Sequence, residues 1–157
     1  MDKKTYNIRV DGIEIIEKSL QKGQVEQDEI FNFEIQAQSL VHQERNLIVV
    51  ITSIEIGKTK TETISVGKIM SAIGFYVDDL MNVLIKKEEG LYEIPVDLEQ
   101  LLKTISISTM RGIMFSEFRG TSLHNAILPI IFADTLKQVK GSLIDQITNT
   151  PITSKLD

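Results

Sequence analysis

The stretch FNFEIQAQ, residues 31–38, decides the fold class of this chain. Apolar and polar residues alternate along its whole length, which is the repeat of a β-strand with one buried and one polar face. The residues that share the apolar face are Phe31, Phe33, Ile35 and Ala37. The stretch therefore predicts a strand that packs one side against a core.

The segments around this stretch repeat the strand signal. Residues 6–15 also alternate, and Gly12 interrupts them in the way a β-bulge does. Residues 47–56 are mostly apolar and β-branched, which is typical of a central strand covered on both faces. Residues 59–66 predict a fourth strand that continues toward Tyr76. Because the connections are short, we expect an antiparallel meander.

A long helix follows these strands. Residues 80–85 are a short apolar run that fits a helix or a strand, and residues 86–90 form a charged loop. Proline disfavours helix in the residue before it and aspartate is a good N-cap, so Pro95 and Asp97 mark the helix start. We expect the helix to span residues 98–119.

The expected helix carries apolar side chains on two nearly opposite sides. One stripe contains Leu98, Leu101, Leu102 and Ile105 and continues through Thr109, Gly112 and Ser116; the other contains Ile107, Met110, Met114 and Phe118. A surface helix of a monomer needs only one apolar face. We therefore expect one side to pack on the sheet and the other to contact a second subunit. The residues assigned to the oligomer interface are Ile107, Met110, Gly112 and Met114; the alternative is a helix enclosed within its own domain.

The chain after the helix is irregular and then helical again. An uncharged stretch runs from Gly120 past Pro129, and Asp134 caps a second amphipathic helix. The residues on the apolar face of that helix are Leu136, Val139, Leu143 and Ile147. We expect residues 150–157 to form a flexible tail. The prediction is one α+β domain over residues 1–157, a four-stranded antiparallel β-meander with two C-terminal helices packed on one face.

The composition fits a soluble globular protein. Of 157 residues, 42% are hydrophobic and 25% charged, which excludes collagen-like, coiled-coil and wholly disordered classes. The net charge of −5 argues against nucleic acid as a partner. Without cysteine there is neither a disulfide framework nor a cysteine zinc site. We find no signal-peptide pattern and no apolar stretch of membrane-spanning length, so we expect a cytoplasmic protein with no membrane insertion.

No pattern of reactive residues predicts catalysis. His42 and His124 have no neighbours at metal-ligand spacing, and the sequence has no G-x-S-x-G, G-x-G-x-x-G or H-E-x-x-H motif. We predict no enzyme activity, no catalytic residues, no cofactor and no metal. Apolar residues in the strand end at residues 74–77 and around the post-helix loop stand out instead. They suit a surface that accepts many partners, unless they complete the core.

The element Arg119-Gly120-Thr121, followed after seven residues by Pro129-Ile130-Ile131-Phe132, resembles the end of the long helix in the SecB family of export chaperones. In that family too, an Arg-Gly-Thr element precedes a mainly apolar crossover loop, a proline and an aromatic residue three positions later. The order of the expected elements agrees over residues 5–147, including a glycine and an aromatic residue at the strand end, Gly74-Phe75.

The resemblance implies an ATP-independent holdase for protein export. Such a chaperone is a cytosolic homotetramer, a dimer of dimers, that binds unfolded precursors and passes them to the motor SecA. Unfolded chains expose apolar segments at many places, so several weak contacts add up on one client. Carried over by position, the resemblance assigns the client-binding grooves to Phe75, Tyr76, Phe115, Phe118, Leu123, Ile127, Leu128 and Ile130.

The sequence departs from the family at three places. Residues 80–95 form a longer segment, and the long helix lacks prolines near its start. Ser65-Val66-Gly67-Lys68 stands where the family's SecA-docking strand has Leu-x-Glu, and a lysine there reverses the sign of a charge-assisted contact. Glu14 and Glu17 would be the remaining members of an acidic patch that docks the motor. A chaperone attached to a toxin-antitoxin system, a non-enzymatic interaction or assembly subunit and a small-molecule carrier are therefore the alternatives.

Overall fold

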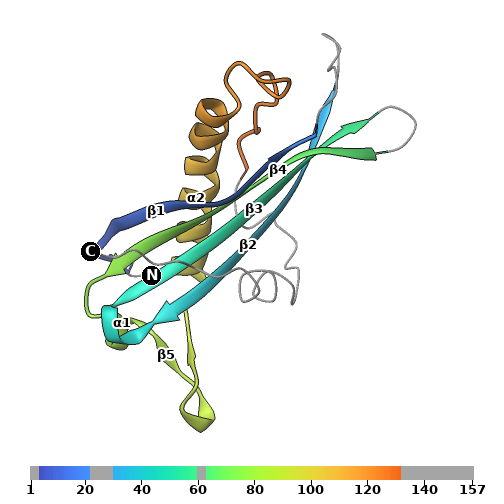
Figure 1. The fold of residues 1–157 in the computed structure, drawn as a ribbon. Helices are drawn as coiled ribbons and strands as arrows, with labels where there is room; N and C mark the ends of the chain where they lie inside the picture. Colours follow the sequence, from blue (N-terminus) through green and yellow to red (C-terminus); the bar gives the residue numbers. More distant parts are fainter. Residues whose placement is uncertain (1–3, 22–29, 60–62, 132–157) are drawn as a thin grey trace.

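The structure is a computed structural model that describes residues 4–21, 30–59 and 63–131 (Figure 1). Its four long strands are β1 (Ile8–Leu20), β2 (Phe31–His42), β3 (Leu47–Thr59) and β4 (Thr63–Val77). The turn between β2 and β3 contains η1 (Gln43–Arg45). The link from β4 to the long helix α2 (Val96–Glu117) contains α1 (Leu80–Val83), β5 (Ile85–Lys86), η2 (Glu88–Gly90) and β6 (Tyr92–Glu93).

The four long strands form one antiparallel sheet in the order β1-β4-β3-β2. The predicted four-stranded antiparallel sheet is thus confirmed, and β2, β3 and β4 do follow one another as a meander. The meander prediction is wrong for β1, which pairs with β4 so that Ile8 lies opposite Val77 and Leu20 opposite Gly67. Alternation along a strand does not specify its neighbour, and the fifteen-residue β4 offers β1 a partner along its full length.

Strand β1 contains two irregularities. Its pairing with β4 shifts between Val10 and Gly12 and again between Ile15 and Glu17. The first shift confirms the bulge predicted at Gly12, and bulges of this kind increase the local twist of a strand. The strand continues beyond residue 15, where its prediction ended, as far as Leu20.

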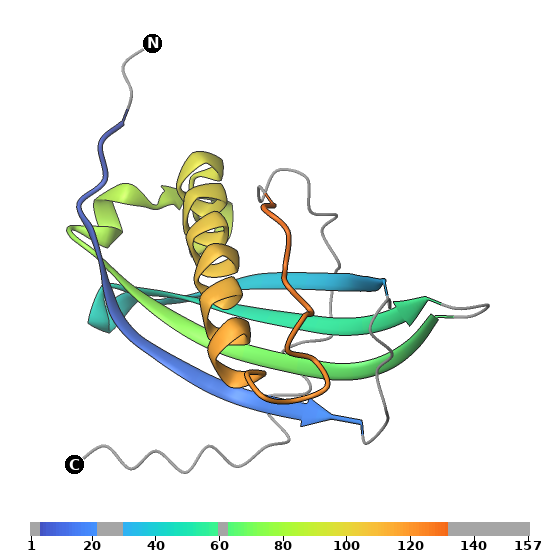
Figure 2. The same ribbon diagram turned by 90° about the horizontal axis from the view of Figure 1, so that it is seen from above.

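Helix α2 lies across one face of the sheet, with the chain that follows it running alongside (Figure 2). It begins at Val96, two residues earlier than predicted, and Pro95 occupies the N-cap position. The capping role predicted for Asp97 is therefore wrong. The Asp97 carboxylate instead accepts the hydroxyl hydrogen of Tyr6, with oxygen separations of 3.0 and 2.8 Å. This bond fastens the start of β1 to the start of α2.

Two apolar clusters fill the space between α2 and the sheet. The first cluster contains Leu98 and Leu102 of α2 together with Ile48, Val50, Ile73, Phe75 and Val77 of the sheet. The second contains Ile107, Met110, Met114 and Phe118 of α2 with Ile54, Ile56 and Ile69 of the sheet, and Leu123, Ala126 and Leu128 from the chain after the helix. Three fully buried hydroxyl side chains lie at the level between them, on Thr52, Ser71 and Ser106.

The assignment of one helix stripe to a subunit interface is wrong for Ile107, Met110 and Met114. Each of these side chains is at most 1% exposed and belongs to the chain's own second cluster. The prediction assumed that the domain has too few elements to cover both sides of the helix. The sheet and the chain after α2 together cover these side chains. Gly112 lies on the uncovered side, with open space where a β carbon would stand.

The remaining segments resolve what the sequence left undecided. The apolar run of residues 80–85 becomes α1 and the start of β5, and the charged loop of residues 86–90 forms the tip of the β5–β6 hairpin, which projects from the sheet (Figure 1). The second helix predicted from Asp134 and the tail of residues 150–157 lie outside the described residues. No helix in the described part of the chain combines the length and apolar character of a membrane span.

Candidate functional site

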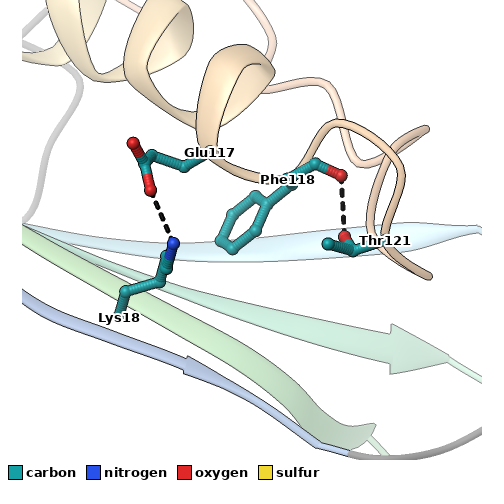
Figure 3. Close-up of polar contacts among 4 residues, drawn as sticks. All are labelled: Lys18, Glu117, Phe118 and Thr121. Carbon is teal, nitrogen blue, oxygen red and sulfur yellow. Dashed lines mark hydrogen bonds and ion pairs between the residues drawn. The ribbon is translucent and has the colours of Figure 1, made fainter.

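Helix α2 ends at Glu117, and the element Arg119-Gly120-Thr121, two residues further on, turns the chain back; Figure 3 shows Phe118 and Thr121 at this turn. Gly120 has a φ of 76°, in the left-handed region that favours glycine. The Phe118 carbonyl accepts hydrogen bonds from the Thr121 hydroxyl, at 2.7 Å, and from the Thr121 amide, at 3.0 Å. The Thr121 hydroxyl in turn accepts the Leu123 amide at 3.2 Å. Glycine and threonine therefore fix the reversal into residues 119–131, which we call the crossover.

An ion pair secures the last turn of α2 from its other side. Lys18 of β1 places its ammonium group 2.6 Å from the Glu117 carboxylate, and both side chains are partly exposed (Figure 3). An exposed pair of this kind contributes roughly 0.2–1 kcal/mol. It joins the edge strand β1 to the helix end from which the crossover starts.

Arg111 holds the returning crossover against α2. Its Nε donates to the Leu128 carbonyl and its Nη2 to the Pro129 carbonyl, both at 2.9 Å. The planar guanidinium presents these donors as a fixed fork, so two successive carbonyls are held at once. This anchoring decides which crossover side chains point toward the core and which point away.

Half of the predicted client-binding residues lie in the core. Phe75, Phe118, Leu123 and Leu128 are each only 1% exposed, so their assignment to an open groove is wrong. Phe75 belongs to the first apolar cluster, and the other three to the second. These crossover side chains are buried because the crossover packs directly on the end of the second cluster, and its inner side chains belong to that cluster.

Tyr76 lies on the opposite face of the sheet from Phe75, because successive side chains of a strand point to opposite faces. Its ring is half-buried, and the Arg9 guanidinium lies 4.3 Å from the ring centroid. This is the geometry of a cation–π contact. The structure thus separates Tyr76 from the crossover residues with which it was grouped.

Three predicted residues remain on the surface, and two of them line the same pocket. Phe115, Ile127 and Ile130 are 58%, 62% and 78% exposed. Phe115 and Ile127 line a pocket of about 290 Å³ between the outer side of α2 and the crossover; its other lining residues are Ser108, Arg111, Gly112, His124 and Ala126. The pocket is at the lower end of the volumes of small-molecule sites, roughly 300–1,000 Å³. It suits one large apolar side chain better than a whole carried ligand.

His124 forms one wall of this pocket. Its ring centroid lies 6.3 Å from that of Phe115, with the two planes tilted by 39°. Neither His124 nor His42 has metal-ligating neighbours, since no group of three or more His, Cys, Asp or Glu side chains within the described residues could hold a metal ion. His124 therefore lines a mainly apolar pocket and is not placed to bind a metal with other described residues.

Sequence reasoning missed two further apolar surfaces. Phe31, Phe33 and Ile35 of the edge strand β2 are half-buried against the second cluster, the same cluster that the crossover seals. On β1, the other edge strand, the apolar residues that remain exposed are Val10, Ile13, Ile15 and Leu20. Strand alternation predicted that most of these apolar residues share one face of their strand. Only the strand order shows that they lie at the two margins of the sheet.

The proposed acidic patch lies on the sheet face away from α2. Glu14 is paired with Ala72 and Glu17 with Met70, and both glutamates are exposed. The Glu17 carboxylate is 3.3 Å from the ammonium group of Lys68. The structure therefore brings the two glutamates to one face but places a positive charge beside one of them.

Comparison with solved structures shows a SecB-like fold. The chain aligns with the Mycobacterium tuberculosis SecB-like chaperone Rv1957, in complex with a ChAD peptide from the Rv1956 HigA1 antitoxin, at a TM-score of 0.56 and 9% identity, covering 79% of this chain and 90% of that one. A Streptococcus agalactiae protein of unknown function aligns at a TM-score of 0.39 and 7% identity, over 82% and 98% of the two chains. No family model matches the sequence, and no curated protein matches it.

Proposed function

We propose that this protein is a SecB-like chaperone that holds unfolded polypeptides without consuming ATP. The observation that supports this function is the pair of exposed apolar side chains Phe115 and Ile127, which line one pocket and which we call the crossover surface; Ile130, further along the crossover, is exposed as well. Large apolar side chains gathered on a surface mark sites of interaction. Burying them against a client gains roughly 25 cal/mol per Å² of apolar area removed from water.

A single crossover surface should bind a client weakly, so tight binding requires several copies of this surface in one oligomer. Linked copies of a weak site raise the apparent affinity for one long client without any new contact. We therefore propose a homo-oligomer, a tetramer arranged as a dimer of dimers, in which several crossover surfaces act on one unfolded chain.

The contact between copies is proposed at β1 rather than at the buried residues Ile107, Met110 and Met114. Strand β1 is at the edge of the sheet, and four of its apolar residues, Val10, Ile13, Ile15 and Leu20, are exposed. An edge strand with exposed apolar residues is a template for pairing with another chain. Gly112 lines the pocket beside the crossover, so the proposed contact between copies does not include it.

Two candidate roles differ in the client that the chaperone binds: exported precursors or an antitoxin. A general export role requires handover to SecA through an acidic surface that includes Glu14 and Glu17, but Lys68 reduces the negative charge there. The solved SecB-like chaperone with this fold is in complex with a peptide from an antitoxin. That observation favours, as the second candidate, a chaperone for the antitoxin of a toxin-antitoxin system.

Light scattering coupled to gel filtration tests the proposed function. The full chain is run alone, with a permanently unfolded polypeptide, and with the same polypeptide folded. We expect one discrete oligomer whose mass increases only with the unfolded chain. A monomer that ignores the unfolded chain would contradict the proposal, and selective binding of one folded partner would instead favour an assembly subunit.

Paired substitutions assign the binding to the crossover surface. Phe115→Asp and Ile127→Asp should weaken binding, because each places a charge in the apolar contact. Leu91→Asp is the matched control: Leu91 is 64% exposed on the β5–β6 hairpin, beyond the opposite end of α2. Equal loss of binding in all three variants would show that general surface charge, and not the crossover surface, controls the interaction.

A further inference from the structure

The second half of α2 and the crossover are positively charged within an acidic protein. The whole chain carries a net charge of −5, but residues 104–131 contain two arginines, Arg111 and Arg119, and one acidic residue, Glu117. Glu117 is already paired with Lys18 at 2.6 Å. Glu117 and Phe115 are two positions apart on α2, which places them on roughly opposite sides of the helix. The only carboxylate of this segment therefore points away from the pocket.

Arg111 brings part of this positive charge to the pocket. Arg111 lines the pocket, and its guanidinium is held against the crossover by the carbonyls of Leu128 and Pro129, each 2.9 Å away. Carbonyl groups accept hydrogen bonds but carry no net charge, so they do not neutralise the cation. The guanidinium has further N–H donors beyond the two that make these bonds. In the described part of the chain, no carboxylate forms an ion pair with Arg111.

The remaining lining gives the pocket its apolar character. Phe115 and Ile127 form its exposed walls, and Gly112 and Ala126 contribute small surfaces between them. With a volume of about 290 Å³, the pocket accommodates one large aliphatic or aromatic side chain. A ligand that matches the site therefore combines an apolar side chain with a nearby negative charge.

We infer that the pocket binds an extended polypeptide segment in which a large apolar residue is flanked by aspartate or glutamate. The apolar side chain enters between Phe115 and Ile127, and the neighbouring carboxylate lies against Arg111. Hydrogen bonds between ionised partners are stronger than those between neutral ones. A lysine at the flanking position meets like charge instead. This inference rests on the proposed function and gives it a client preference.

A peptide series tests the preference on the full-length protein. Three fluorescent peptides share a central phenylalanine and differ only in its two neighbours, which are glutamate, glutamine or lysine. We expect fluorescence anisotropy to give the lowest Kd for the glutamate peptide, about 3-fold or more below that of the glutamine peptide, and the highest Kd for the lysine peptide. The difference should shrink as salt rises, because an exposed charge contact is screened.

Substitutions at Arg111 separate its charge from its structural role. Arg111→Lys keeps the charge and should retain the order of the three peptides, whereas Arg111→Gln should bring their Kd values together. Arg119→Gln, at an exposed arginine that makes no side-chain bond within the described residues, should reduce the difference without touching the anchor of the crossover. Lys103→Gln is the control, since Lys103 pairs with Glu99 on another side of α2. Circular dichroism confirms that each variant is folded.

The outcomes distinguish the inference from the function on which it rests. Equal Kd values for the three peptides, or tightest binding of the lysine peptide, would overturn the charge preference and leave the chaperone proposal standing. If none of the peptides and no unfolded polypeptide binds, both the function and the preference are wrong.

Discussion

Gly67 of β4 lies directly beneath Leu123 of the crossover. A β carbon at Gly67 would stand 2.5 Å from Cδ1 of Leu123 and 3.2 Å from the Ser19 carbonyl oxygen. A strand interior often contains glycine where another part of the chain approaches closely. The contact lets the crossover rest on the sheet and buries Leu123, which therefore stabilises the core.

Gly67→Ala should destabilise the protein. The added methyl group displaces the end of the Leu123 side chain and crowds the β1 backbone, at a cost of about 1–3 kcal/mol typical of overpacking. Urea unfolding measures the loss. Gly112→Ala is the control, because Gly112 is exposed in the middle of α2 with open space around it. That change should raise the free energy of unfolding by about 0.5–1 kcal/mol; stabilisation by both changes would contradict the packing at Gly67.

Two phenylalanines of α2 should differ sharply in their effect on stability. Phe118→Ala removes a side chain that is 1% exposed and should cost about 3–5 kcal/mol. Phe115→Ala removes an exposed ring and should change stability by no more than about 0.5 kcal/mol. Thermal unfolding measures stability, and binding of an unfolded polypeptide measures function. We expect only Phe115→Ala to reduce binding in a fully folded protein. If Phe118→Ala instead reduced binding without loss of stability, Phe118 would belong to the binding surface.

Two of the three buried hydroxyl groups between the apolar clusters should lower the stability of the fold. The side-chain oxygens of Thr52 and Ser106 make no hydrogen bond with any described residue, while Ser71 Oγ donates to Met110 Sδ at 2.8 Å. Ser106→Ala removes an unsatisfied polar atom and should stabilise the protein by about 1 kcal/mol more than Ser108→Ala. Ser108 lies on the exposed side of the same helix, so the comparison cancels helix propensity. Equal effects of the two changes would indicate that Ser106 is satisfied in solution.

The bond between Tyr6 and Asp97 should make stability depend on alkaline pH. Burial, then the hydrogen bond to Asp97 and its negative charge, raise the pKa of Tyr6 from 10.0 to about 12. The folded state therefore holds the phenolic proton more tightly than the unfolded state does. This stabilisation is complete below pH 10 and is lost as the pH rises through about 12.

Tyr6→Phe isolates this contribution from that of other groups that titrate at alkaline pH. The difference in Tm between the native protein and the variant should stay constant below pH 10 and shrink between pH 10 and about 12. A difference that does not change over this range would show that Tyr6 is bonded to Asp97 no more strongly than to water.

Local structure followed from local pattern in several places. The alternation in residues 31–38 predicted β2, and Gly12 predicted the first bulge of β1. Pro95 and Asp97 predicted the start of α2 to within two residues, because proline disfavours helix in the residue before it. The reversal at Gly120 likewise depends on a single residue with a left-handed φ. Each feature is set by the conformations open to a few neighbouring residues, so the sequence is sufficient to predict it.

The strand order and the sorting of the crossover residues were decided by tertiary structure. Strand β1 could pair with β2 or with β4 without any change in its own alternation, and the choice of β4 depends on the long free edge of that strand. Leu128 and Ile127 are adjacent and both apolar, but only Leu128 is buried, because Arg111 and the sheet fix which side of the crossover faces the core. The sequence by itself determined the four long strands, the long helix and which residues are apolar. Which of those residues remain exposed to bind a partner depends on contacts between segments far apart in the chain, and only the folded structure decides it.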